Sequence, residues 1–219
     1  MIKNKTDETI QSINTTEHMV DKQSRTASIE RKSKETQILV EINLDQSGIN
    51  DIKTPLPFFT HMLDTFACHS KIGLNIKATG DTEVDPHHLM EDVGIVLGQC
   101  IFKALGVLTG IQRAGCFSFP MDGSLAVIAL DICGRSNLVW NVQLTSQAVG
   151  TLDPKLFKEF FKGLVDGLRS TIHVNLLYGD NDHHVIEAIF KSFARSLREA
   201  IAPLHDPLIL STKGIFDEE

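Results

Sequence analysis

Hydrophobic residues recur with a strand period in some segments and with a helical period in others, so the pattern separates predicted strands from predicted helices. Residues 37–44 alternate strictly between polar and apolar side chains and predict a strand with one face on a core. Apolar residues then recur at helical spacing from Phe58 to Ala67, after two prolines that a helix start tolerates. Residues 73–78 predict another strand, and residues 87–108 predict a long helix.

The second half of the chain repeats this order. It predicts strands near residues 115–119, 124–131 and 137–144, a helix from Pro154 through Leu164, a strand at 171–177 and a helix from His183 to about Ile201. Short sequences also recur, since Gly80-Asp81 returns as Gly179-Asp180. Such a duplication predicts two α+β units, each with helices on one face of a small sheet, related by an approximate twofold axis.

These patterns divide the chain into three segments. Residues 1–30 carry scattered charges and no sustained period, so we expect a flexible N-terminal extension. Residues 31–110 form the first repeat and residues 111–216 the second, and together they make one compact domain. With 219 residues, of which 42% are hydrophobic, the chain is long enough to bury a substantial core.

Charge and hydropathy narrow the class of protein. A net charge of -7 gives no electrostatic reason to expect nucleic acid or an anionic membrane as a partner. The longest apolar runs are far shorter than the roughly 20 residues that a membrane helix needs. The N-terminal residues lack the apolar segment of a secretory signal, so we expect a cytoplasmic protein.

Two copies of a His-His-x-x-Glu motif, at residues 87–91 and 183–187, carry the clearest chemical signal. Each copy opens a predicted helix, where residues four apart share a face and immediate neighbours point about 100° apart. His87 and Glu91 can therefore chelate one cation together, and the second motif repeats this geometry. Imidazole and carboxylate ligands without thiolate suit manganese, iron or catalytic zinc.

The two motifs also predict how the ions are shared. If the two repeats face each other, His184 would join the chelating pair of the first motif, and His88 would join that of the second. The alternative is that each histidine pair is a polar, solvent-exposed pair at a helix N-terminus without a metal. A protonated histidine is mildly disfavoured there by the helix dipole. Two pairs at the same repeat position, each with a glutamate at the same offset, favour metal binding.

Further polar side chains extend the candidate site. His61 lies in the preceding helix, where it can complete the shell of one ion, and Glu159 occupies the equivalent place in the second half. His69 suits a supporting or structural role. A basic set suits a phosphate group, although each member alone is also typical of a solvated surface: Arg113, Arg135, Lys191 and the turn Ser211-Thr212-Lys213-Gly214.

Seven short blocks, which run in order through residues 30–216, together resemble the imidazoleglycerol-phosphate dehydratase family. The blocks are His61-Met62-Leu63-Asp64, Gly80-Asp81, His87-His88-x-x-Glu91-Asp92, Pro120-Met121-Asp122, Asp131-x-x-Gly134-Arg135, His183-His184-x-x-Glu187-Ala188 and Ser211-Thr212-Lys213-Gly214. The resemblance implies a hydro-lyase of histidine biosynthesis that removes water from imidazoleglycerol phosphate to give imidazole acetol phosphate. It also implies an α+β fold of duplicated β-β-α-β-α units, with the helices between two small sheets, as in domain 2 of ribosomal protein S5.

The resemblance further implies two manganese ions in each active site. One ion takes His61, His88, His183 and Glu187, and the other takes His87, Glu91, His184 and Glu159, a position where relatives often have histidine. The implied substrate contacts come from Glu35, His61, His69, Arg113, Arg135, Lys191, Ser211, Thr212 and Lys213. The available catalytic carboxylates are Glu35, Glu91 and Glu187, which the sequence does not rank. Members of the family form trimers that assemble into shells of 24 subunits, with active sites at subunit interfaces.

Two other classes of protein fit the ligand set. A di-metal hydrolase or oxidase can use the same histidines and glutamates, but it needs no imidazole-shaped pocket. A metal-storage or scaffold shell needs the metals and the symmetry, but it has no use for the basic set. Arg113, Arg135 and Lys191 therefore favour an enzyme over a shell.

Overall fold

The computed structural model describes residues 24–48 and 50–204. Within them no helix has the length and apolar character that crossing a bilayer requires. The elements run in the order β1 (Thr26–Lys32), β2 (Thr36–Asn43), β3 (Asp51–Lys53), α1 (Pro57–Ser70), β4 (Gly73–Gly80), α2 (His87–Leu105), β5 (Ala114–Met121), β6 (Ser124–Asp131), β7 (Asn137–Asn141), α3 (Leu156–Leu168), β8 (Thr171–Tyr178) and α4 (Asp182–Ala200).

The strands form two sheets with the same topology. The strand order is β1-β2-β4-β3 in the first sheet and β5-β6-β8-β7 in the second. In each sheet the first three strands are antiparallel and the last one pairs in parallel with its neighbour. The predicted duplication is therefore confirmed, but each unit contains β-β-β-α-β-α rather than β-β-α-β-α.

The sequence patterns missed two strands of the first repeat. Strand β1 begins at Thr26, so the prediction that residues up to 30 form a flexible extension is wrong for its last part. This edge strand buries Ala27 and Ile29 only partly, which leaves a weak hydrophobic alternation. Strand β3 has only three residues, too few to show a period. Residues 1–23 of the expected extension lie outside the described part of the chain.

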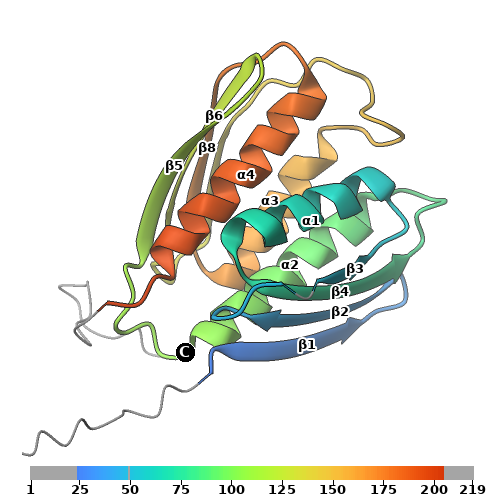
Figure 1. Cartoon of the computed structure of the whole chain (residues 1–219). Coiled ribbons are helices and arrows are strands. Elements are labelled where there is room, and N and C mark those ends of the chain that lie inside the picture. Colours follow the sequence, from blue (N-terminus) through green and yellow to red (C-terminus); the bar gives the residue numbers. More distant parts are fainter. Residues whose placement is uncertain (1–23, 49, 205–219) are drawn as a thin grey trace, which may run out of the picture.

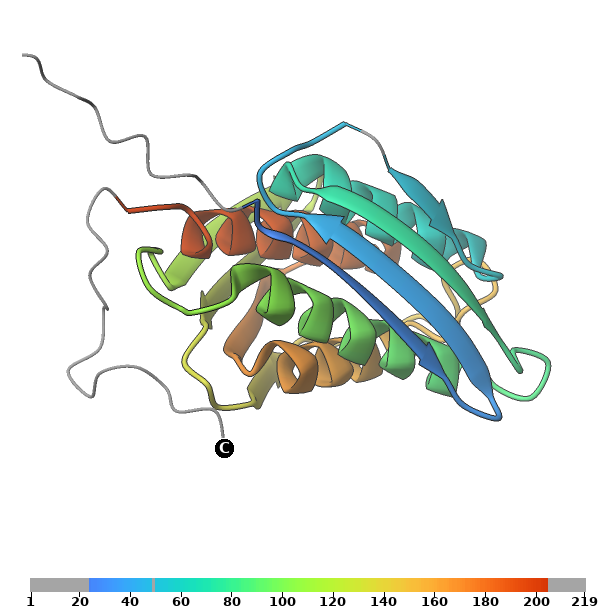
Figure 2. The ribbon, with the colours of Figure 1, turned by 90° about the horizontal axis from the view of Figure 1, so that it is seen from below.

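All four helices of the described chain lie between the two sheets (Figure 1). Helices α1 and α2 cover the inner face of the first sheet, and α3 and α4 cover that of the second. Figure 2 shows the first sheet from outside, with the helices behind it. Across the middle of the molecule, α2 packs on α3 and α1 packs on α4. The predicted α+β layers are thereby confirmed.

Glycines bring α2 and α3 unusually close together. Gly94 and Gly98 of α2 face Gly163 and Gly167 of α3, and a Cβ atom added at any of the four would meet backbone atoms of the other helix. At Gly163 the added Cβ would overlap the carbonyl oxygen of Glu91. The two helices run in the same direction, so their N-terminal turns lie beside each other.

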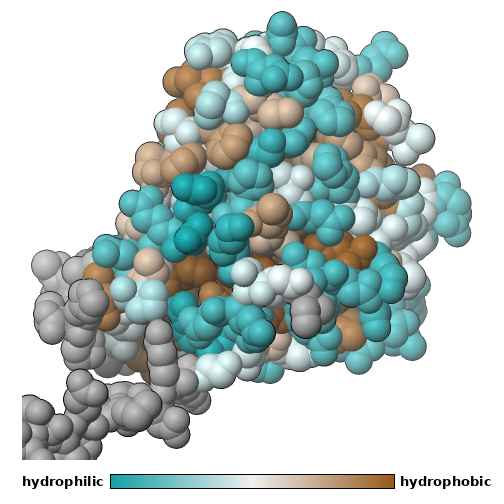
Figure 3. Space-filling model, in the orientation of Figure 1, coloured by the Kyte–Doolittle hydropathy of each residue, from teal (hydrophilic) through white to brown (hydrophobic). Residues whose placement is uncertain are grey.

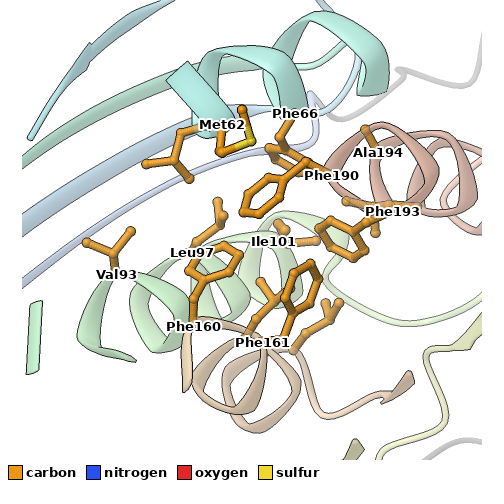
Figure 4. Close-up of a cluster of buried hydrophobic side chains, with 14 of the residues drawn as sticks. Met62, Phe66, Val93, Leu97, Ile101, Phe160, Phe161, Phe190, Phe193 and Ala194 are labelled. Atoms are coloured by element: carbon orange, nitrogen blue, oxygen red, sulfur yellow. The ribbon is translucent and has the colours of Figure 1, made fainter. Parts of the chain in front are cut away.

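Phenylalanines fill the space between the helix pairs (Figure 4). Phe66 of α1 stacks on Phe193 of α4, with ring centroids 5.2 Å apart. Phe160 of α3 stacks on Phe190 of α4 at 5.4 Å. Because these rings come from three helices and are all buried, they fix the relative rotation of the helices.

Replacing Gly163 by alanine tests the close approach of α2 and α3. Alanine favours an isolated helix by about 1 kcal/mol, but the overlap with the backbone of Glu91 outweighs this gain. We expect Gly163→Ala to destabilise the protein by about 1–3 kcal/mol or more, measured by urea unfolding. Asp166→Ala, at an exposed position of the same helix, is the control and should change stability little. Equal stability of both variants would contradict the packing.

Candidate functional site

Both His-His-x-x-Glu motifs occupy the first turn of a helix, as predicted. The Oδ1 atom of Asp85 accepts a hydrogen bond from the backbone N–H of His87 at 2.8 Å. Asn181 does the same for His183 at 3.0 Å and for His184 at 3.4 Å. In both repeats a polar side chain two residues before the motif thus holds the turn that carries the histidines.

One predicted set of ligands converges in the structure. His61 of α1 lies beside His183 and Glu187 of α4, and one potential ligand atom from each lies within 4.8 Å of the others. The Nε2 atom of His183 is 3.6 Å from the Oε2 atom of Glu187. Among the described residues, these three side chains form the single group of at least three histidine, cysteine, aspartate or glutamate residues that is spaced closely enough to hold a metal ion.

A lysine stabilises the ionised form of the Glu187 carboxylate. Lys191, one helical turn further along α4, places its Nζ atom 2.8 Å from Oε1 of Glu187. Burial raises the pKa of Glu187, but the hydrogen bond and charge of Lys191 outweigh burial and lower it. The ammonium group also lies 5.3 Å from the ring centroid of Phe119. Glu187 is therefore an ionised carboxylate at neutral pH, as a metal ligand must be.

The donor set fits a divalent transition metal. Two imidazoles and one carboxylate supply nitrogen and oxygen donors of the kind that manganese, iron and zinc accept. His61 and His183 are exposed to solvent, so their nitrogen atoms are accessible to an ion. Three protein ligands also leave coordination positions open for a substrate or for side chains of another subunit.

The counterpart in the first repeat is less complete. His87 and Glu91 of α2 are 3.9 Å apart, but Glu159 of α3 does not form a metal-spaced group with them. Its carboxylate pairs with Lys162 at 2.7 and 2.9 Å. The close α2–α3 contact nevertheless places Gly163, one turn after Glu159, against the backbone of Glu91. This arrangement mirrors α1 and α4, where the converging ligands lie.

The second histidine of each motif lies apart from these groups. His88 has its Nδ1 atom 3.6 Å from Oε2 of Glu35, and His184 has its Nε2 atom 3.5 Å from Oδ2 of Asp122. Neither histidine joins the cluster of His61 in the described chain. A single subunit thus does not form the predicted exchange of His88 and His184 between the two ions. The sequence patterns had not assigned Asp122 to the site, although it occupies a hairpin in the second repeat as Glu35 does in the first.

The predicted arginines lie at the far end of α4. The backbone N–H of Arg113 donates to the carbonyl of Ala200, 17 residues after His183, which corresponds to about 25 Å along a helix. Its side chain forms an ion pair with Asp131 at 2.7 and 2.9 Å, which raises the pKa of Arg113. Arg135 is exposed after β6, near the same end. These arginines do not reach the His61 cluster of their own chain.

The other predicted substrate residues differ in their position. His69 lies with its ring edge-on to Phe119, at a centroid distance of 5.3 Å. Burial, followed by the positive charge of Lys191, lowers the pKa of His69, so its imidazole is neutral at pH 7. His69 and Lys191 therefore share one surface beside the cluster. Ser211, Thr212 and Lys213 lie outside the described residues.

Comparisons with known proteins agree with this arrangement. A family model described as imidazoleglycerol-phosphate dehydratase matches residues 54–197. The imidazoleglycerol-phosphate dehydratase of Thermosynechococcus vestitus is 48% identical over 87% of this chain and 92% of its own length. That of Geobacter sulfurreducens is 47% identical over 87% of this chain and 98% of its own length.

Solved structures carry the same fold. Imidazoleglycerol-phosphate dehydratase from Staphylococcus aureus superposes with a TM-score of 0.74 at 39% identity, covering 81% of this chain and 99% of the other. The enzyme from Pyrococcus furiosus gives a TM-score of 0.75 at 36% identity, covering 86% and 100%. With the converging histidines and glutamate, these similarities show that the chain belongs to the imidazoleglycerol-phosphate dehydratase family.

Proposed function

We propose that this chain removes water from imidazoleglycerol phosphate to give imidazole acetol phosphate, as a hydro-lyase of histidine biosynthesis. The observation that carries the proposal is the convergence of His61, His183 and Glu187 in a chain of this family. A hydrolase or oxidase with the same ligands finds no support among the relatives. The cytoplasmic location expected from the sequence stays a prediction.

The metal is manganese, with two ions in each active site. His61, His183 and Glu187 hold one ion together with His88 of a neighbouring subunit, and His87, Glu91 and Glu159 hold the other together with His184 of a neighbouring subunit. Manganese supplies Lewis acidity to the imidazole ring of the substrate when it is bound. The accessible nitrogen and oxygen donors suit a divalent transition metal, manganese among them, and the choice of manganese and of two ions follows the resemblance to the family.

Glu35 is the carboxylate best placed to move a proton. Glu91 and Glu187 belong to the metal-chelating pairs, whereas Glu35 lies on the β1–β2 hairpin and has an exposed side chain. Its Oε2 atom lies 3.6 Å from His88, so it is at the edge of the site. A carboxylate in this position can take a proton from bound substrate and return it to the leaving hydroxyl.

A second subunit completes the active site. The arginines that suit a phosphate lie at the end of α4 about 25 Å from His183 of the same chain. They do not reach a phosphate bound at the His61 cluster of their own chain, and we propose that they serve a site on a neighbouring subunit. Exposed apolar side chains on β7 and β8 are candidates for subunit contacts: Val139, Leu177 and Tyr178 are 39%, 60% and 61% exposed. We propose trimers assembled into a shell of 24 subunits.

Turnover is the direct test of the proposed reaction. Incubation of the manganese-loaded protein with imidazoleglycerol phosphate should yield imidazole acetol phosphate, detected by mass spectrometry. A chelator should abolish the product, and added Mn²⁺ should restore it. The absence of product with Mn²⁺ bound would overturn the assignment as a dehydratase.

Two glutamate variants should separate metal binding from proton transfer. Glu187→Gln removes the charge from a ligand, so we expect weaker Mn²⁺ binding and a loss of activity of at least about 100-fold. Glu35→Gln should lower kcat by about 10²–10⁴-fold while Mn²⁺ binding stays intact. Asp166→Asn, an exposed carboxamide substitution on α3, is the control for both measurements. Normal activity of Glu35→Gln would exclude Glu35 as the acid–base group.

Complementation tests the shared site. His183→Ala and Arg135→Ala should each be inactive alone, the first through metal loss and the second through weak phosphate binding. When both variants are co-expressed, some sites combine the intact histidine of one subunit with the intact arginine of another. We therefore expect part of the activity to return in mixed oligomers. If each subunit held a complete site, every site would remain defective.

A further inference from the structure

Each repeat places a hairpin carboxylate against the second histidine of its own motif. In the first repeat Glu35, between β1 and β2, lies 3.6 Å from His88. In the second repeat Asp122, between β5 and β6, lies 3.5 Å from His184. The two contacts occur at equivalent places in sheets of identical topology. Both repeats therefore place a hairpin carboxylate beside the second histidine, at Nδ1 of His88 in the first repeat and at Nε2 of His184 in the second.

The hairpin that carries Asp122 is firmly held. Met121 pairs with Ser124 across a two-residue turn formed by Asp122 and Gly123. Asp122 has a φ of 45°, in the left-handed region that this turn requires. A Cβ added to Gly123 would come within 2.9 Å of a carboxylate oxygen of Asp180, so the turn packs closely on the end of β8. The tip of the hairpin thus has a fixed place beside α4.

His184 depends on this hairpin for a carboxylate partner. His183 has Glu187 on its own helix face, whereas the ring of His184 is turned by 86° from that of His183. Among the described residues, Asp122 is the carboxylate that forms an ion pair with His184. Neither the helix geometry nor the motif itself provides this contact, because Asp122 lies more than 60 residues earlier in the chain.

A carboxylate on one imidazole nitrogen determines what the other nitrogen can do. An imidazole that donates its N–H to a carboxylate presents the lone pair of the opposite nitrogen in a fixed direction. Metal-bound histidines commonly have such a partner, and its loss weakens metal binding. At 3.5 Å a small rotation of the Asp122 side chain brings it into hydrogen-bond range of Nε2.

We infer that Asp122 is a positioning residue that orients His184 for metal binding. The inference rests on the proposed function, in which His184 is a ligand. Asp122 is one methylene shorter than Glu35 and lies on a two-residue turn, so its carboxylate has the shorter reach away from the histidine. The two related hairpins therefore divide the work: one carboxylate moves protons and the other fixes a ligand.

Binding of Mn²⁺ to the full-length assembled protein tests the inference, measured from the electron paramagnetic resonance signal of free Mn²⁺. Asp122→Gly removes the carboxylate and tolerates the left-handed turn. We expect Mn²⁺ affinity to fall about 10–100-fold, with an unchanged Tm. Asp122→Asn keeps an acceptor oxygen and should lie between this variant and the unchanged protein. The control is Asp166→Ala, because a glycine at this helical position would itself destabilise the protein. Its Mn²⁺ affinity should equal that of the unchanged protein.

The outcomes separate the two levels of the proposal. Equal Mn²⁺ affinity of Asp122→Gly and the unchanged protein would overturn the positioning role alone. If the unchanged protein bound no Mn²⁺, the proposed metal site would fail and the inference with it. At saturating Mn²⁺ the kcat of Asp122→Gly should return to within a few-fold of normal, because the carboxylate does not touch the substrate. Activity that stayed lost with all sites filled would also overturn the positioning role.

Discussion

The contact between α2 and α3 sets the spacing of the whole molecule. Glycines at four positions allow the two backbones to touch, and any side chain there would separate the helices. Because each helix also covers one sheet, this contact fixes the distance between the sheets. It brings the first turns of α2 and α3 together, and the phenylalanine core does the same for α1 and α4. The position of every candidate ligand follows from these two helix pairs.

Electrostatics then determine the state of the candidate ligands. The face in Figure 3 is predominantly hydrophilic where α1 and α4 reach the surface, with apolar patches between the polar side chains. Lys191 keeps Glu187 ionised by lowering its pKa, and burial with nearby positive charge keeps His69 neutral. A lysine held by Glu187 and Phe119 is also available to an anionic group beside the cluster. The same side chains can therefore prepare a ligand and attract a phosphorylated substrate.

The duplication explains why the site is divided. Each repeat carries a chelating His–Glu pair and a second histidine that points elsewhere, so each chain offers incomplete groups at separate places. The arginines at the other end of α4 add a third incomplete group. Under the proposed function these groups meet only when subunits assemble symmetrically, so that each subunit contributes the same residues to its neighbours.

The sequence alone determined the local structure and the chemical character of this protein. Strict alternation in β2 and helical spacing in α1, α2 and α4 marked these elements, because a buried face imposes its period on the residues that form it. The repeated motif indicated metal binding, since residues four apart share a helix face. The hydrophobic pattern indicated β1 only weakly, because this strand is half buried, and β3 only weakly, because three residues are too few to show a period.

Only the tertiary structure decided which groups meet. It joined His61 to His183 and Glu187, and it left His88 and His184 beside hairpin carboxylates. It also placed Arg113 at the end of α4 opposite His183, although both belong to the predicted site. Contacts of this kind depend on how distant elements pack, and packing distances have no period along the chain from which they can be predicted.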